Sequence, residues 1–500
     1  MLDQSFSDSN FNLIFLKENR KGSIKKNHLN EAYFNKHDEF NVLLNEKIEL
    51  KKTRALTVEE FDSFAERLEI INKAKEEIRN TLFSEYSKII NNEEDKFCFE
   101  IKYDKQNKIY TTKKDGVHFF SIKQLQQNLN KTFKVRQADR NRIIKQTYNL
   151  ISDGFPKVII RTDIYKFYES IPQKELFEKL ENNTLLSPLS KKLLKRLFFE
   201  FEKIKDLSIM ESKRGVPRGF GVSAYLSELY MREIDEEIKS LPDVIYYARY
   251  VDDIIIIFSP KTKSQVRDYR SEIKKIINDG KLEINDNLEG RKDKTHTIEL
   301  YYDKSQTKTF SELHSLTFLG YKFNITHYPK GLGTHPKTSI DISLSEDRLL
   351  RYKNRIESSI IIYNKDSKYH EKRARKLLIE RFKFLCGNYN LNHNKKNIRA
   401  GIYYSNKMLE LTDLGDSLEK LNEFKIKALE NLEIPPKIAI DVENLENFIG
   451  NRFCFEKAFI EKEKHFYSFK FNVKEQSYYN KKFKRLTNKF EVIKSIWKNE

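Results

Sequence analysis

The stretch that decides the fold is VIYYARYVDDIIIIF, residues 244–258, in which two runs of strand-forming side chains flank Val251, Asp252 and Asp253. The runs are rich in β-branched and aromatic residues, and the interruption between them has the length of a tight turn. This pattern predicts an antiparallel hairpin with acidic residues at its tip. Taken alone, an Asp-Asp pair at a turn is also ordinary turn chemistry, because aspartate favours turns.

A second stretch, KVIIRTDIYKFY at 157–168, brings Asp163 to the end of another β-branched run. An aspartate at this place also suits a helix cap. Carboxylates that share a shielded site raise one another's pKa unless a cation joins them. Asp163 and Asp252, with Asp253 close by, therefore predict a divalent cation site, and oxygen ligands alone favour Mg²⁺ or Mn²⁺.

Between these stretches lies KRGVPRGFGVSAYLSELYM, residues 213–231, with glycine, proline and serine crowded ahead of an amphipathic helix. Such a loop can bring backbone and small side chains against a flat ligand before the helix begins. A flexible surface turn would have a similar composition.

Read in order, these segments resemble the reverse transcriptases. D-x-x-x-F-Y at 163–168, R-G-V-P-R-G-x-G-x-S at 214–223, Y-V-D-D at 250–253 and F-L-G-Y at 318–321 follow motifs A, B, C and E of that family. The resemblance covers roughly 130–325. It implies an α+β fold, a right-hand polymerase whose fingers and palm contain antiparallel sheet, and a mainly helical C-terminal region.

The resemblance also assigns site residues. Asp163, Asp252 and Asp253 would be the catalytic residues and would hold two metal ions, with the Ile164 carbonyl completing the coordination. Tyr168 would be the aromatic steric gate that excludes a ribose 2′-OH, although packing inside the palm is its alternative role. The F-L-G-Y segment would be the primer grip.

Further residues are assigned to nucleotide binding. Arg218 and Ser223 would line the nucleotide and template site, Arg136 and Arg140 would grip the incoming triphosphate, and Lys294 resembles the motif D lysine. A solvated helix face explains the two fingers arginines almost as well. The family usually has glutamine where Arg218 stands and proline where Ala224 stands, which puts template fidelity in doubt because a guanidinium does not bond as an amide does.

Composition agrees with a polyanionic partner. Lys and Arg number 93 against 74 Asp and Glu, a formal net charge of +19. The three cysteines stand far apart without the spacing of a disulfide framework or zinc site. The beginning of the sequence has neither a basic nor an apolar signal region. We therefore expect a cytoplasmic protein in a reducing compartment, with no membrane association.

We expect three parts. Residues 1–125 are an N-terminal extension with part of the fingers, 126–330 are the fingers and palm, and 331–500 are a helical thumb followed by a basic nucleic-acid-binding region. Residues 1–50 are polar and read as an irregular arm. Thr57 and Glu60 have capping-box spacing ahead of a helix, and Ser187 followed by Pro188 is typical of another helix start. The runs KFCFEIKYD and KIYTT, between about 95 and 122, read as short strands.

The arginine in P-R-G and the SAYLSELYM continuation most resemble the bacterial antiphage reverse transcriptases of the abortive-infection and defence-associated classes. This likeness implies an RNA template such as a non-coding RNA, deoxynucleoside triphosphates as substrates, a DNA product and a homo-oligomer. It also implies protein priming, for which Tyr478 and Tyr479 are the first candidates. The alternatives are a retroelement enzyme, an RNA polymerase, or an inactive RNA-binding protein on a polymerase scaffold.

Overall fold

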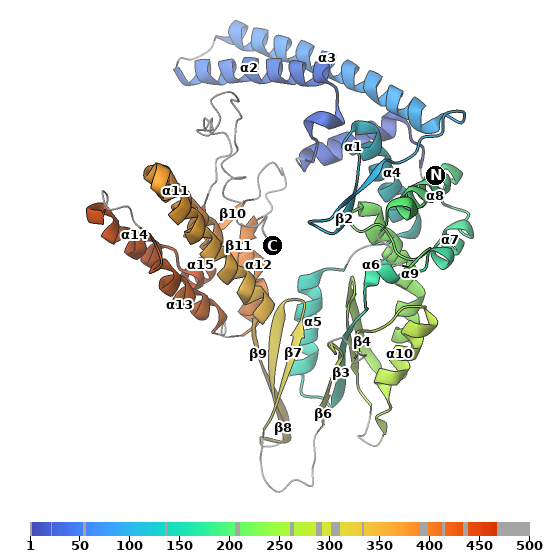
Figure 1. Ribbon diagram of the computed structural model, residues 1–500, viewed down its shortest axis with the longest axis vertical. Helices are drawn as coiled ribbons and strands as arrows, with labels where there is room; N and C mark the ends of the chain where they lie inside the picture. Colours follow the sequence, from blue (N-terminus) through green and yellow to red (C-terminus); the bar gives the residue numbers. More distant parts are fainter. Residues whose placement is uncertain are drawn as a thin grey trace. The chain divides into compact units, whose positions relative to one another are not determined.

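The computed structural model describes residues 3–467, apart from 22, 54–56, 136–137, 206–210, 261–264, 287–292, 302–310, 333–334, 391–398, 413–415 and 434–438. The chain divides into two compact units, each built from separate stretches of sequence (Figure 1). The first unit comprises Met1–Ala138, Thr162–Pro242 and Asp268–Thr295, and the second comprises Asp139–Arg161, Asp243–Arg267 and His296–Glu500. The three consecutive parts predicted from the sequence stay a prediction.

The first unit is mainly helical. Its longer helices are α1 (Asp8–Arg20), α2 (Glu31–Thr53), α3 (Val58–Asn91), α4 (Gly116–Phe133), α7 (Gln173–Glu181), α8 (Pro188–Ile204), α9 (Gly221–Lys239) and α10 (Tyr269–Asp279). A short hairpin of β1 (Ile101–Asp104) and β2 (Ile109–Thr112) confirms the short strands expected in this region. Helix α6 (Phe167–Ser170) follows the motif A aspartate.

The expectation of an irregular arm over residues 1–50 is wrong, because α1 and α2 occupy most of it. Ser7 Oγ accepts a hydrogen bond from the Asn10 amide and so caps α1. Phe11, Ile14 and Phe15 follow at helical spacing and are buried. The polar composition of the segment hid this short apolar stripe.

Two helix starts read from the sequence are confirmed. Thr57 Oγ1 accepts from the Glu60 amide at 3.2 Å while Glu60 Oε2 accepts from the Thr57 amide at 3.1 Å, so the capping box ahead of α3 is closed in both directions. Ser187 caps α8, with Pro188 at its first position. In Figure 1, α2 and α3 lie side by side.

The second unit carries two antiparallel sheets and a helical C-terminal region. One sheet has the order β4-β5-β3-β6, from β4 (Val244–Tyr250), β5 (Asp253–Phe258), β3 (Lys157–Asp163) and β6 (His296–Leu300); the last two residues of β3 belong to the first unit. The other has the order β7-β8-β9, from β7 (Glu312–Phe318), β8 (Tyr321–Leu332) and β9 (His335–Leu344). This mixed α+β architecture confirms the predicted fold class.

Helices dominate the chain after β9. They are α11 (Glu346–Cys386), α12 (Ile402–Ser405), α13 (Ser417–Leu429), α14 (Ala439–Arg452) and α15 (Phe455–Ile460). Helix α5 (Arg140–Ser152), which comes earlier in the chain, also belongs to this unit. Helix α11 is kinked at His370, whose backbone is not helical. Three short strands, β10 (Asn388–Asn390), β11 (Arg399–Gly401) and β12 (Phe466–Tyr467), form a small sheet beside these helices.

In the part of the chain that the structure describes, no helix is both long enough and apolar enough to cross a lipid bilayer.

We predict that Thr57→Ala lowers the free energy of unfolding by about 1 kcal/mol, because α3 loses the side-chain acceptor for one of its first amides. Thr81→Ala in the same helix is the matched control, since Thr81 Oγ1 only donates back to the Glu77 carbonyl. Urea denaturation followed by circular dichroism measures both variants. Equal losses in the two would contradict the capping role.

Candidate active site

Asp163 stands at the end of strand β3, and its carboxylate is only partly paired. The residue is 5% exposed. Its Oδ2 accepts a hydrogen bond from Lys294 Nζ at 3.0 Å, whereas Oδ1 is buried and has no hydrogen-bond partner among the described residues. A buried carboxylate oxygen without a partner is costly, and a metal cation would satisfy it.

The backbone around Asp163 is fixed by the segment that leads to Lys294. The amide of Asn285 donates to the Asp163 carbonyl at 2.9 Å, and the amide of Tyr165 donates to the Glu283 carbonyl at 2.8 Å. These two bonds form an isolated bridge between Ile164 and Ile284 that does not engage the Ile164 carbonyl. The Ile164 carbonyl oxygen, which is predicted to bind a metal ion, therefore takes no part in this pairing.

The acidic hairpin has the predicted form, with β4 and β5 paired in register from Tyr250 and Asp253. Val251, in the turn, has a φ of 62°. A β-branched residue in the left-handed region is strained, and such strain often accompanies function. Arg249 Nη1 donates to the Val251 carbonyl at 2.8 Å and supports this conformation.

Asp253, the first residue of β5, pairs with Arg161 on the neighbouring strand β3, at 2.5 Å between Oδ1 and Nη2. Sequence reasoning missed Arg161. The spacing of Arg161 and Asp163 could have indicated it, because residues two apart on a strand point to the same face of the sheet.

These residue types fit a divalent cation, because carboxylates and carbonyl oxygens are the ligands that Mg²⁺ and Mn²⁺ prefer. The orphaned Oδ1 of Asp163 is the structural observation in favour. Among the residues that the structure describes, no group of three or more His, Cys, Asp or Glu side chains is arranged to hold a metal ion.

The glycine-rich loop is bonded to the segment that carries Tyr168. The amide of Val216 donates to the Tyr168 carbonyl at 2.8 Å, and the amide of Gly215 donates to the Ile171 carbonyl at 2.8 Å. Tyr168 is half-buried, with its ring 5.3 Å from that of Phe167. The structure thus brings together the motif A tyrosine and the motif B loop, which the sequence separates by more than forty residues.

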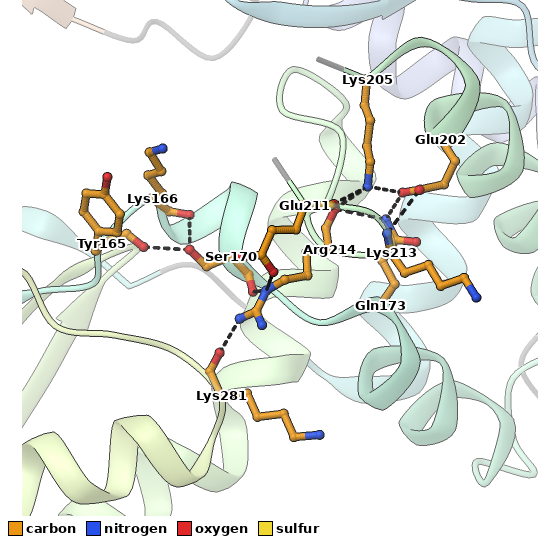
Figure 2. A network of polar contacts seen from close by, with 10 residues as sticks. All are labelled: Tyr165, Lys166, Ser170, Gln173, Glu202, Lys205, Glu211, Lys213, Arg214 and Lys281. Atoms are coloured by element: carbon orange, nitrogen blue, oxygen red, sulfur yellow. Dashed lines mark hydrogen bonds and ion pairs between the residues drawn. The ribbon is translucent and has the colours of Figure 1, made fainter. Parts of the chain in front are cut away.

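A network of polar contacts fixes the position of the same loop, as Figure 2 shows. Lys205 Nζ donates to Glu202 Oε1 at 2.6 Å, to the Glu211 carbonyl at 2.6 Å and to the Arg214 carbonyl at 3.1 Å. Gln173 Nε2 donates to Glu202 Oε1 at 2.6 Å and to the Gly215 carbonyl at 2.9 Å. No local pattern in the sequence indicates this network, because its members come from three separate segments.

Arg214 extends the network toward α6 and the residues that follow α10. Its Nε donates to the Ser170 carbonyl at 3.1 Å and its Nη2 donates to the Lys281 carbonyl at 2.7 Å (Figure 2). The loop is therefore held on one side by α7 and α8 and on the other by the residues that follow α10.

Arg218 and Ser223 occupy different surroundings within the loop region. The Arg218 side chain is exposed, whereas its carbonyl accepts from the Tyr110 amide of β2 at 2.7 Å. Ser223 is buried and its hydroxyl donates to the Pro217 carbonyl at 2.7 Å. A ligand would therefore meet the Arg218 guanidinium more readily than the Ser223 hydroxyl.

Gly219 makes the approach of the β1–β2 hairpin to this loop possible. It has a φ of 107°, and a Cβ built on it would lie 2.6 Å from the Tyr110 carbonyl oxygen. Only glycine combines that backbone conformation with so close a contact.

Of the remaining predicted residues, only Arg140 lies within the described part of the chain. Arg140 belongs to the second unit, where its guanidinium donates to the Leu319 carbonyl, from Nε at 3.0 Å. Arg136, Tyr478 and Tyr479 lie outside the described residues. Their predicted roles stay predictions.

A comparison with protein families matches part of the chain. Residues 105–323 match the family model described as "Reverse transcriptase (RNA-dependent DNA polymerase)". The matched range, which is less than half of the chain, contains all four motifs identified in the sequence.

Solved telomerase structures are also similar. That of Candida albicans telomerase with a fragment of telomeric RNA has 14% identity and a TM-score of 0.28, over 64% of this chain and 56% of that one. That of Candida tropicalis telomerase with a fragment of telomeric RNA has 14% identity and a TM-score of 0.30, over 76% and 57%. This chain thus spans little more than half the length of those structures. No curated protein matches the sequence.

We predict that Gly219→Ala lowers the free energy of unfolding by about 2 kcal/mol or more, because the new Cβ meets the Tyr110 carbonyl in an unfavourable φ region. Gly450→Ala is the matched control, since a Cβ there meets nothing within 4 Å. Differential scanning calorimetry compares the two. A melting temperature for Gly219→Ala equal to that of the control would refute the close contact.

Proposed function

We propose that this protein is an RNA-directed DNA polymerase whose catalytic residues are Asp163, Asp252 and Asp253. The observation that carries the proposal is the buried, half-paired carboxylate of Asp163 at the end of β3. The strand order, in which β5 neighbours β3, and the contact of Arg161 with Asp253 support it. So do the four motifs in their family order and the matching family model.

The three carboxylates and the Ile164 carbonyl would hold two divalent ions. When bound, such ions lower the pKa of an attacking hydroxyl and neutralise charge on departing pyrophosphate. Lys294, now bonded to Asp163, would keep that carboxylate oriented and offer a proton near the pyrophosphate. The reaction would be accelerated by the positioning of the reactants and by electrostatic stabilisation of the transition state.

The protein's other groups would select and orient the nucleotide. The Tyr168 ring would occupy the space of a ribose 2′-OH, and the exposed Arg218 guanidinium would contact phosphate or stack on a base. Ser223 would act through the Pro217 carbonyl that it holds. Arg136 and Arg140 as triphosphate ligands belong to the same proposal.

We further propose the bacterial antiphage class, with a non-coding RNA as template and a homo-oligomeric state, on the likeness of P-R-G and SAYLSELYM. In the same proposal the first 125 residues extend the fingers, and the helices after β9 form the thumb. Priming from Tyr478 or Tyr479 is part of it, since the phenolic oxygen of a tyrosine can replace a primer 3′-OH as the nucleophile.

Replacing Asp252 and Asp253 together with alanine should reduce DNA synthesis to background while leaving the melting temperature close to that of the parent. The carboxylates would hold metal rather than core. Primer extension on an RNA template in Mg²⁺ measures the first effect. The same variant should lose protection of a bacterial host against phage, measured by plating efficiency.

Asp95→Ala, at an exposed position of the first unit, is the matched control and should retain full synthesis. Synthesis by the double variant would disprove the catalytic assignment. Protection that survives in an inactive double variant would instead disprove the link between polymerisation and defence.

Tyr168→Val should admit ribonucleotides, raising the ratio of their kcat/KM to that of deoxynucleotides by about tenfold or more, because exclusion disappears with the blocking ring. Deoxynucleotide incorporation should survive. Tyr369→Val, which alters a 73% exposed tyrosine, is the control. An unchanged ratio would leave Tyr168 as a packing residue.

A further inference from the structure

Two buried threonines flank the contact between Asp163 and Lys294. Thr162 precedes Asp163 on β3, and Thr295 follows Lys294. Their hydroxyl oxygens lie 2.8 Å apart, and this hydrogen bond joins residues that are 133 positions apart in the sequence. Thr162 is fully buried and Thr295 is 6% exposed. Both belong to the first unit, so the pair links the segment that supplies the carboxylate to the segment that supplies the ammonium.

The backbone of Asn285 joins the same two segments. Its carbonyl accepts hydrogen bonds from the Thr295 hydroxyl at 3.3 Å and from the Lys294 amide at 3.0 Å. Its amide donates to the Asp163 carbonyl at 2.9 Å. Because the Thr295 hydroxyl has a single proton and donates it to Asn285, Thr162 is the donor within the pair of hydroxyls.

Two ion pairs anchor the neighbouring residues to helix α10. Lys274 of α10 pairs with Asp286, with 2.6 Å between Nζ and Oδ2. Arg270, also on α10, pairs with Asp293 at 3.0 Å between Nη2 and Oδ2. Asp293 Oδ1 in turn accepts a hydrogen bond from the Thr295 amide at 2.8 Å. The backbone that carries the lysine is therefore fixed by α10 on one side and by β3 on the other.

The Lys294 side chain needs such a fixed base. It is long and flexible, and it is 48% exposed, so holding its ammonium in one place costs rotamer entropy. Threonine is β-branched and has few side-chain rotamers, so its hydroxyl is well placed to fix a backbone position. Buried hydroxyls keep their hydrogen bond only while the two segments stay together, because an unpaired buried hydroxyl is unfavourable. The pair thus favours the backbone position from which Lys294 reaches Asp163.

We propose that Thr162 and Thr295 are positioning residues, which hold Lys294 Nζ against the Asp163 carboxylate through their paired hydroxyls and the Asn285 carbonyl. The inference rests on the proposed polymerase function, in which Lys294 offers a proton near the pyrophosphate. Neither threonine lies within the four motif segments. Because both are buried, they act through the lysine and not on the nucleotide.

Variants of nearly constant shape test the inference. Thr295→Val removes the hydroxyl, Thr295→Ser keeps it, and Thr295→Val is also combined with Lys294→Ala. The double variant Thr162→Val/Thr295→Val leaves neither hydroxyl unpaired, so it replaces the single valine variant where that one is unstable. Thr132→Val is the matched control, since the Thr132 hydroxyl on α4 is buried and has no hydrogen-bond partner among the described residues.

Two measurements are made on each full-length variant. Primer extension on an RNA template in Mg²⁺, at saturating duplex, gives kcat and KM for deoxynucleotides. Acylation of the folded protein by an N-hydroxysuccinimide ester, without metal or nucleotide, reports how accessible Lys294 Nζ is. Mass spectrometry quantifies the modified lysine, with Lys281, which pairs with Glu175, as the internal reference.

We expect Thr295→Val to lower kcat by about tenfold and to change KM by less than about twofold, because the ammonium is displaced while the nucleotide contacts remain. Thr295→Ser should keep kcat within about threefold of the parent, because serine offers the same hydroxyl. With Lys294→Ala already present, Thr295→Val should change kcat by less than about twofold, because the group that it positions is gone. Thr132→Val should match the parent.

Acylation of Lys294 relative to Lys281 should rise by about threefold or more in Thr295→Val, because local release of the side chain exposes it to the reagent. Unchanged acylation would overturn the inference. Equal losses of kcat with and without Lys294 would also overturn it, since the threonines would then act on another part of the site. Faster acylation in a protein that makes no DNA would instead refute the proposed function and leave the positioning role intact, so the two failures are distinguishable.

Discussion

The contact between Lys294 and Asp163 is the interaction around which the candidate site is organised. The middle of strand β3, Val158–Ile160, is apolar, and the Asp163 carboxylate at the end of the strand accepts a hydrogen bond from Lys294 Nζ. The bridge between Ile164 and Ile284 fixes the backbone at the same point. Among the described residues, the buried Oδ1 of Asp163 has no hydrogen-bond partner, and its negative charge favours a cation there.

In the polar network around the glycine-rich loop, by contrast, the buried charged group is fully hydrogen-bonded. Lys205 is buried, yet its three donors meet Glu202 and the carbonyls of Glu211 and Arg214. A cation so fully satisfied has no capacity left for a ligand, and its role is to fix the loop that carries Arg218. Among the described residues, Asp163 Oδ1 is buried without a hydrogen-bond partner, which is why we assign a ligand to Asp163 and not to Lys205.

The sequence predicted what depends on neighbours along the chain. The hairpin around Asp252, the capping box at Thr57 and the start of α8 at Ser187 are local patterns, and all three are present. The contact of Arg140 with Leu319 spans 179 residues, and no local pattern encodes it. The helices of residues 1–50 were missed for another reason, because a narrow apolar stripe within a polar segment gives a weak periodic signal.

Two of the motif turns contain a strained residue, and both residues are stabilised in the same way. Val251 in the acidic hairpin and Leu319 in the β7–β8 turn are both non-glycine residues at positive φ. In each case an arginine donates to the carbonyl of the strained residue, Arg249 to Val251 and Arg140 to Leu319. A neutral donor would stabilise such a turn as well. An arginine also leaves a permanent positive charge at each turn, which favours a nearby anion.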